Sequence, residues 1–143
     1  MKKFFISHFT DTAASLFIVL FLYTAVSKLL DYRSFYATMD IMPLLKGKGF
    51  ILAPSIIVSE IIISFVLLIP ALRVLGLYCS LALMSVFTIY LLFAVMSGYS
   101  LPCNCGGVLR QLSWKQHLLF NIAFVLVAIS GIVSHLKQKH LLQ

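Results

Sequence analysis

Long apolar runs separated by short polar segments dominate the chain. Four runs stand out, at residues 13–30, 50–70, 72–96 and 118–136. Each is close to the roughly 20 residues that a helix needs to cross the hydrocarbon core of a bilayer. Because a backbone exposed to lipid must satisfy its polar groups internally, such runs cross a membrane as helices. The pattern therefore predicts an all-α, polytopic membrane protein built as a bundle of four transmembrane helices.

The connections indicate how these helices are arranged. A turn of a few residues around Pro70 and Arg73 joins the second and third runs, so their helices pair as an antiparallel hairpin in an up-down bundle. The first connection, residues 31–49, is the longest and carries several aromatic and methionine side chains. It is either a segment lying in the membrane interface or an ordinary amphipathic connector. We expect residues 1–143 to form one membrane domain.

The N-terminus has some features of a secretory signal, because Lys2 and Lys3 precede the first apolar run. Polar residues separate these lysines from the run, however, and no small-residue cleavage site follows it. The run is also longer than the roughly 7–15 apolar residues of a signal peptide. We therefore expect an uncleaved first transmembrane helix.

Composition supports a lipid environment. The chain is 62% hydrophobic and 10% charged, with a mean hydropathy of +1.06, whereas a soluble domain is about 45–50% apolar and about 25% charged. The net charge of +7 comes mainly from basic residues at helix ends and in loops, where they bind lipid headgroups, so it does not indicate nucleic-acid binding. Both ends of the bundle carry similar numbers of these residues, so charge does not orient the chain.

The most informative segment is a Pro-Cys-x-Cys-Gly-Gly motif in the connection before the last run, which contains Cys103 and Cys105. Cysteines one residue apart bridge only through a small, strained ring, and strained disulfides are easily reduced. Gly106 and Gly107 leave room beside the sulfurs for another backbone. The motif predicts thiol–disulfide exchange with Cys103 and Cys105 as the catalytic residues. Such a pair is useful in an oxidising compartment, which favours an outward-facing loop and inward-facing termini.

Two other interpretations of the cysteine pair stay open. Two thiolates are an incomplete ligand set for tetrahedral zinc, so a copper or zinc site would need His117 or a second subunit to add ligands. The loop can also be purely structural. The third cysteine, Cys79, lies about 27 Å deeper along its helix, too far to join the pair. We expect Cys79 to be a small packing residue.

Polar residues gather in the half of the predicted bundle nearest the cysteine loop. Glu60 lies about 15 Å below the upper end of its run. Residues from the other runs fall within the same half: Tyr23, Ser27, Lys28, Thr88, Tyr90, His117 and Asn121. Charges inside a bilayer are usually paired or functional. The layer is therefore either a proton or quinone site coupled to the thiols, or a structural pair of Glu60 with Lys28 or a tyrosine. Trp114 is expected to anchor the last helix at the interface.

The chain resembles the MauE/DoxX-like redox-associated membrane proteins, a bacterial inner-membrane family. The likeness extends over nearly the whole chain. It is carried by residues 22–31, 60, 83–90 and, most specifically, by 102–109 followed by Trp114, His117, Leu118, Phe120 and Asn121.

The resemblance implies a four-helix bundle in the inner membrane, with Cys103 and Cys105 facing the periplasm. This agrees with the cytoplasmic termini expected from the chemistry of the cysteine pair. The resemblance also implies a role in disulfide formation or maturation of an exported redox protein, by analogy with methylamine dehydrogenase, although a methylamine substrate does not follow. DoxX relatives are linked to quinone reduction, so the resemblance implies a quinone cofactor. Glu60, Lys28 and Tyr90 would then serve proton or electron transfer. The rival function is a non-enzymatic membrane subunit or maturation chaperone.

Overall fold

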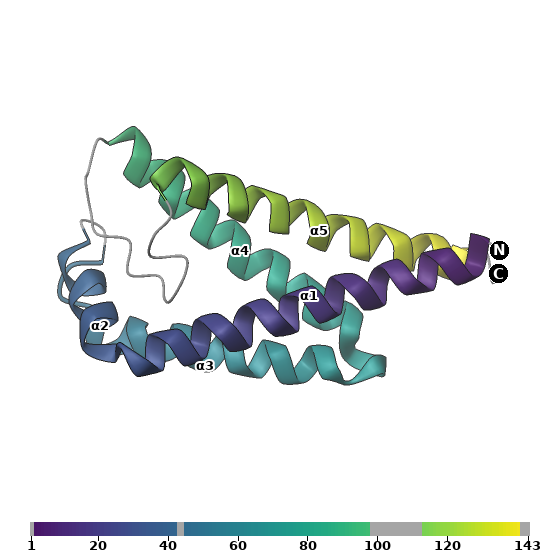
Figure 1. Ribbon diagram of the computed structural model, residues 1–143, viewed down its shortest axis with the longest axis horizontal. Helices are drawn as coiled ribbons and strands as arrows, with labels where there is room; N and C mark the ends of the chain where they lie inside the picture. The colour runs from purple at the N-terminus through teal and green to yellow at the C-terminus, as the bar shows by residue number, and fades with distance from the viewer. Residues whose placement is uncertain (1, 43–44, 98–112, 141–143) are drawn as a thin grey trace.

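The computed structural model describes residues 2–42, 45–97 and 113–140. Within these ranges the chain forms α1 (Lys2–Leu30), α2 (Tyr32–Ile41), α3 (Gly49–Leu68), a 3-10 turn (Pro70–Leu72), α4 (Arg73–Met96) and α5 (Trp114–His140) (Figure 1). Four segments of the described residues are long and apolar enough to cross a membrane: Phe9–Leu30, Gly49–Leu68, Pro70–Phe93 and Lys115–Lys137. The prediction of an all-α bundle of four transmembrane helices is confirmed.

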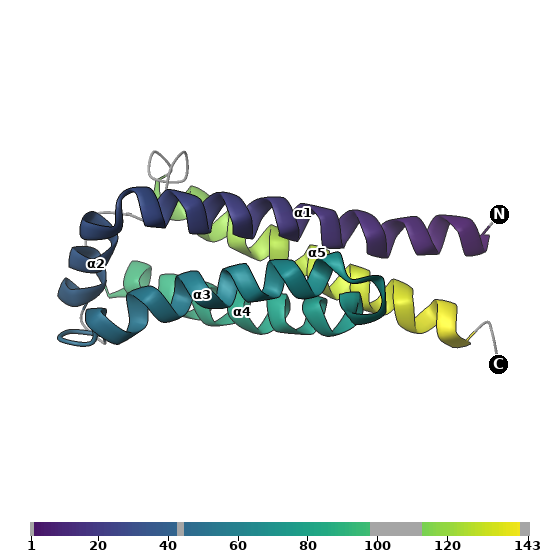
Figure 2. The same ribbon diagram turned by 90° about the horizontal axis from the view of Figure 1, so that it is seen from below.

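The four long helices alternate in direction and close into a ring. Helix α1 packs against α3 and α5, and α4 packs against the same two helices. Helix α2 lies across one end of the ring, which we call the α2 end, whereas the start of α1 and the end of α5 lie at the opposite, terminal end (Figure 2). Helix α4 runs towards the α2 end and α5 runs away from it (Figure 1). The connection between α4 and α5 therefore joins two helix ends that lie at the α2 end.

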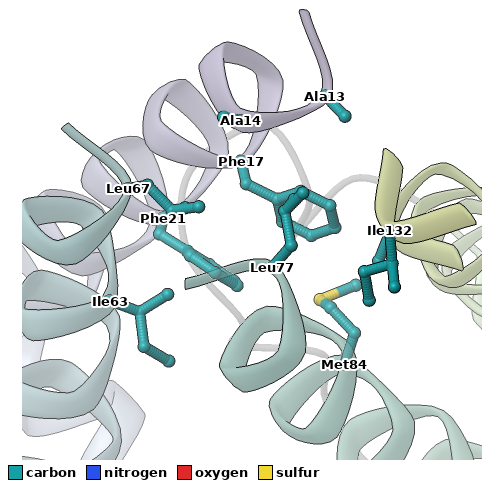
Figure 3. Close-up of a cluster of buried hydrophobic side chains, with 10 residues drawn as sticks. Ala13, Ala14, Phe17, Phe21, Ile63, Leu67, Leu77, Met84 and Ile132 are labelled. Carbon is teal, nitrogen blue, oxygen red and sulfur yellow. The ribbon is translucent and has the colours of Figure 1, made fainter. Parts of the chain in front are cut away.

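The apolar core fills the terminal half of the ring. Its buried side chains come from all four long helices and are Ala13, Ala14, Phe17, Phe21, Ile63, Leu67, Leu77, Met84, Ala128 and Ile132 (Figure 3). Two glycines bring the helices close together. A Cβ atom on Gly76 would lie 2.6 Å from a methyl carbon of Leu67, and one on Gly131 would lie 3.0 Å from the Cβ of Ala13. Small residues at helix contacts are typical of membrane bundles, because packing drives helix association in lipid.

Polar contacts at the terminal end tie α1 to its neighbours. The Thr10 hydroxyl donates to the carbonyl of Gly131 at 3.2 Å. An Arg73 Nη1 donates to the Asp11 carboxylate at 2.6 Å, and these two side chains are 30% and 47% exposed. The Asp11–Arg73 pair is therefore partly solvated or in contact with headgroups, and its attraction is screened.

Arg73→Gln is expected to lower the free energy of unfolding by less than about 1 kcal/mol, as is usual for an exposed ion pair. The measurement is unfolding of the purified chain in mixed micelles. Asp11→Asn serves as the companion variant and should show a similarly small loss. A loss of about 3 kcal/mol, the size expected when a buried pair is broken, would show that the pair is dehydrated.

The second transmembrane helix is slightly shorter than its apolar run. Helix α3 ends at Leu68, and Ile69 is extended with ψ of 113°. The residue before a proline avoids the helical conformation, because the proline ring would clash with its backbone. Pro70 therefore ends the helix and starts the tight turn that the sequence predicts between α3 and α4.

The prediction that Cys79 is a packing residue is wrong. Its side chain is exposed on the outer side of α4, where lipid would cover it, and the neighbouring Ser80 is buried instead. A small apolar side chain is acceptable on either face of a transmembrane helix, because lipid and protein interior are both apolar. Residue type therefore did not indicate the direction in which Cys79 points.

Candidate functional site

A buried ion pair joins α1 to α3 near the α2 end. Lys28 Nζ donates to Glu60 Oε1, and the two side chains are only 5% and 2% exposed. The ammonium nitrogen also lies 5.6 Å from the ring centre of Phe35 and 5.8 Å from that of Phe87. Aromatic faces attract cations at this range. One carboxylate oxygen and two aromatic rings therefore surround the charge of Lys28.

The second carboxylate oxygen of Glu60, Oε2, is not bound by Lys28. Oε2 is buried and has no hydrogen-bond partner among the described residues. The Thr24 hydroxyl lies close to the carboxylate, but its proton is donated to the carbonyl of Phe21 at 3.2 Å. One turn further along α3, the Ser64 hydroxyl donates to the backbone carbonyl of Glu60 at 2.8 Å and does not reach the carboxylate. The carboxylate thus keeps one acceptor position open.

The ion pair faces a cavity of about 80 Å³ to which all five helices contribute. Its polar lining comes from Thr24, Lys28, Glu60, Tyr90, His117 and Asn121. The remaining lining side chains are aromatic, methionine or aliphatic, among them Phe35, Met39, Phe87 and Phe120. A single water needs roughly 10–15 Å³ of cavity volume. The cavity therefore has room for several waters or for part of a larger ligand.

The start of α5 brings His117 and Asn121 to the cavity. The Ser113 hydroxyl accepts from the backbone N–H of Gln116 at 3.4 Å, and the Gln116 side chain accepts from the N–H of Ser113 at 2.9 Å. This reciprocal pair is a capping box, which fixes where a helix begins. His117 follows directly, and Asn121 lies one turn later on the same face. Both are only 4% exposed.

The structure brings together five of the polar residues that the sequence assigns to a functional layer. Lys28, Glu60, Tyr90, His117 and Asn121 all line the cavity.

Three other members of the predicted layer lie outside the cavity lining. Tyr23 is 41% exposed and points outward, and Ser27 is only partly buried. Thr88 donates to the carbonyl of Met84 at 2.7 Å within its own helix. The layer is therefore smaller than the sequence predicts.

The predicted cysteine motif lies outside the described residues. This holds for Cys103, Cys105, Gly106 and Gly107, and also for the side chain of Trp114, which is the first residue of α5. The described residues contain no group of three or more His, Cys, Asp or Glu side chains placed to hold a metal ion.

Helix α2 and Thr24 contribute to the cavity although the sequence patterns above do not single them out. Phe35 and Met39 lie one turn apart on the buried face of α2 and line the cavity. Thr24 lies one turn before Lys28 and is also buried. The four-residue spacing in both pairs is the signal that would have identified them, because residues four apart share one face of a helix.

One comparison with known proteins identifies a family. The model of the family described as methylamine utilisation protein MauE matches residues 6–134, which include every described residue of the cavity. No curated protein and no solved structure shows significant similarity to the chain. The match confirms the resemblance to MauE seen in the sequence. The chain is a multi-pass membrane protein that belongs to the MauE family.

Proposed function

We propose that this protein carries out thiol–disulfide exchange through Cys103 and Cys105 and so supports disulfide formation or maturation of an exported partner protein. The observation that supports the proposal is the buried Lys28–Glu60 pair in a cavity at the α2 end. The cysteine motif belongs to the connection between α4 and α5, whose flanking helix ends lie at this same end. Ionisable groups inside a bilayer usually mark a functional path.

The proposed exchange conserves atoms and electrons. A partner thiolate attacks one sulfur of the Cys103–Cys105 disulfide, which forms a mixed disulfide and releases the other cysteine as a thiolate. A second thiolate of the partner then attacks the mixed disulfide. The partner leaves with a disulfide, and Cys103 and Cys105 are left as a dithiol. Two electrons and two protons have then moved from the partner to this chain.

Repeated oxidation of partners needs an acceptor for these electrons, and the family resemblance implies a quinone. The residues of the cavity fit a quinone headgroup. Aromatic and methionine side chains suit the faces of a ring, and Lys28 and Asn121 carry N–H donors suited to its carbonyl oxygens. Glu60, Lys28 and Tyr90 would serve the proton side of the reaction. We further propose that the protein lies in the bacterial inner membrane with the cysteine connection in the periplasm.

Single variants of the cysteine pair should trap the partner. In Cys103→Ala or Cys105→Ala the remaining thiolate can attack the disulfide of an oxidised partner, and the mixed disulfide that forms cannot be resolved within the pair. At least one variant should therefore accumulate a partner adduct that reductant releases. The double variant should trap nothing. Adducts are detected in intact membranes after acid quenching and thiol alkylation.

Cys79→Ala is the matched control, because Cys79 is the remaining cysteine and lies on the outer side of α4. It should trap no adduct and should leave partner oxidation unchanged. The exchange mechanism is wrong if neither single variant forms an adduct and the wild-type pair stays reduced under oxidising growth. Cysteine-to-serine variants that leave partner maturation intact would indicate the non-enzymatic membrane subunit instead.

A further inference from the structure

The open acceptor position on Glu60 is unusual for an ion pair with a purely structural role. A structural pair is most stable when both oxygens of its carboxylate are hydrogen-bonded, because an unsatisfied buried acceptor costs about 1–3 kcal/mol. Here Lys28 satisfies Oε1, and Oε2 has no donor among the described residues. Glu60 lines the cavity of about 80 Å³. Most of the cavity lining is apolar, but the polar side chains of Thr24, Lys28, Tyr90, His117 and Asn121 also line it, and a water that they hold can supply the missing donor.

We propose that Glu60 is a water-accessible proton-exchange site, in which Oε2 gains and loses a proton through waters in the cavity and Lys28 holds the carboxylate in place. The ligands of this site are water and the proton. Lys28 is a positioning residue, because it binds Oε1 and leaves Oε2 free to react. The polar side chains of α5, His117 and Asn121, lie on the same cavity and can share these waters.

The surroundings of Glu60 favour such exchange. Helix α1 presents Lys28, α4 presents Tyr90 and α5 presents His117 to the same cavity. From α2 the lining residues are the apolar Phe35 and Met39, whereas its acidic residue, Asp40, packs against Gly49 at the start of α3. Lys28 is therefore the one fixed positive charge among the described lining residues, and its single neighbouring carboxylate is Glu60.

The role of Glu60 in a reaction rests on the proposed thiol–disulfide function. Oxidation of a dithiol to a disulfide releases two protons along with two electrons. A quinone that accepts the two electrons would also take up two protons, so the thiol protons have to be relayed through the protein. Glu60 would take up one of these protons and pass it on through the waters of the cavity.

Infrared spectroscopy can test the site directly, because the chain has only four Asp and Glu residues. The full-length protein is placed in lipid nanodiscs, and spectra are recorded as the buffer is changed between alkaline and acidic pH in H₂O and in D₂O. A protonated carboxyl group gives a C=O stretching band that shifts in D₂O. Among the bands that appear on acidification, we expect one that is absent from Glu60→Gln and that shifts within the mixing time in D₂O.

Control variants separate Glu60 from other groups and from misfolding. Asp11→Asn should keep the Glu60 band, because Asp11 lies in the partly exposed pair at the terminal end. The double variant Lys28→Met/Glu60→Gln leaves no unpaired charge, so it should fold and still lack the band. The proposal is overturned if Glu60→Gln loses no band, or if the Glu60 band does not shift in D₂O, because Glu60 would then be shielded from water.

The same spectra in the Cys103→Ala/Cys105→Ala background separate the two proposals. Proton exchange at Glu60 needs no thiol, so the band and its shift should persist there. If they persist while partner trapping fails, the thiol–disulfide function is wrong and the proton site stands. If trapping succeeds while the band is unchanged in Glu60→Gln, the thiol chemistry stands and the proton site is wrong.

Discussion

Lys28→Met will lower the free energy of unfolding by about 3–5 kcal/mol, because it leaves a buried carboxylate without its cation. Glu60 is 2% exposed and sits inside the ring of helices, so the few waters of the cavity cannot stabilise its charge as bulk water would at a surface. Methionine keeps most of the length and volume of the lysine stem, which limits the effect of lost packing. The measurement is reversible unfolding in mixed micelles, with far-UV circular dichroism as the probe.

The double variant Lys28→Met/Glu60→Leu shows whether the loss comes from the charge. Replacing both partners of a buried ion pair by apolar residues is often neutral or stabilising, because neither charge has to leave water. We therefore expect the double variant to recover most of the loss. A double variant as unstable as Lys28→Met would show that methionine disturbs the contacts with Phe35 and Phe87. The contrast with Arg73→Gln, whose pair is partly exposed, tests the role of burial.

The number and direction of the membrane helices follow from the sequence because lipid imposes a simple requirement. About 20 apolar residues are needed for each crossing, and a short turn forces neighbouring helices to be antiparallel. The depth of a residue in the membrane also follows, at 1.5 Å per residue. For this reason counting along the runs placed Lys28, Glu60, His117 and Asn121 in the same half of the bundle.

The face of the helix on which each residue lies is harder to predict. In a soluble protein the buried face is apolar and the outer face is polar, whereas in lipid both faces are apolar and this contrast is lost. Tyr23 and Thr24 are neighbours and both are polar, yet Tyr23 is 41% exposed and Thr24 is 6% exposed. The same ambiguity led to the wrong prediction for Cys79. Depth is readable from one sequence, but rotation about the helix axis is not.

Helix α2 shows a second limit. Residues 31–49 carry Phe35, Met39 and Met42, which fit an interfacial segment as well as a buried one. The structure buries all three, and Ala25 and Ile57 pack in the same cluster. A ten-residue helix is too short to be stable alone and depends on tertiary packing. The position of α2 across the bundle therefore depends on the assembled long helices. Because α2 lines the cavity, one side of the cavity depends on this packing as well.

Phe17→Ala should lower the free energy of unfolding by about 3 kcal/mol, which is at the low end of the losses for Phe-to-Ala changes in protein cores. The variant tests whether packing in the terminal half holds the bundle together. The Phe17 side chain is fully buried, and its ring centre lies 5.5 Å from that of Phe21 and 5.3 Å from that of Phe124 (Figure 3 shows Phe17 and Phe21). The transfer of apolar surface from water contributes little, because the separated helices remain in lipid. The loss of stability arises instead because the side chains around the empty space lose their van der Waals contacts with the Phe17 ring.

Phe65→Ala is the matched control, since it removes the same side chain from the lipid-facing side of α3, where Phe65 is 61% exposed. Lipid chains can fill the space left there, so the change should stay within about 0.5 kcal/mol. Unfolding of both variants in mixed micelles gives the comparison. Equal losses would mean that the apolar core of the terminal half does not hold the helices together. In that case the Lys28–Glu60 pair and the contacts of α2 would have to supply the stability of the bundle.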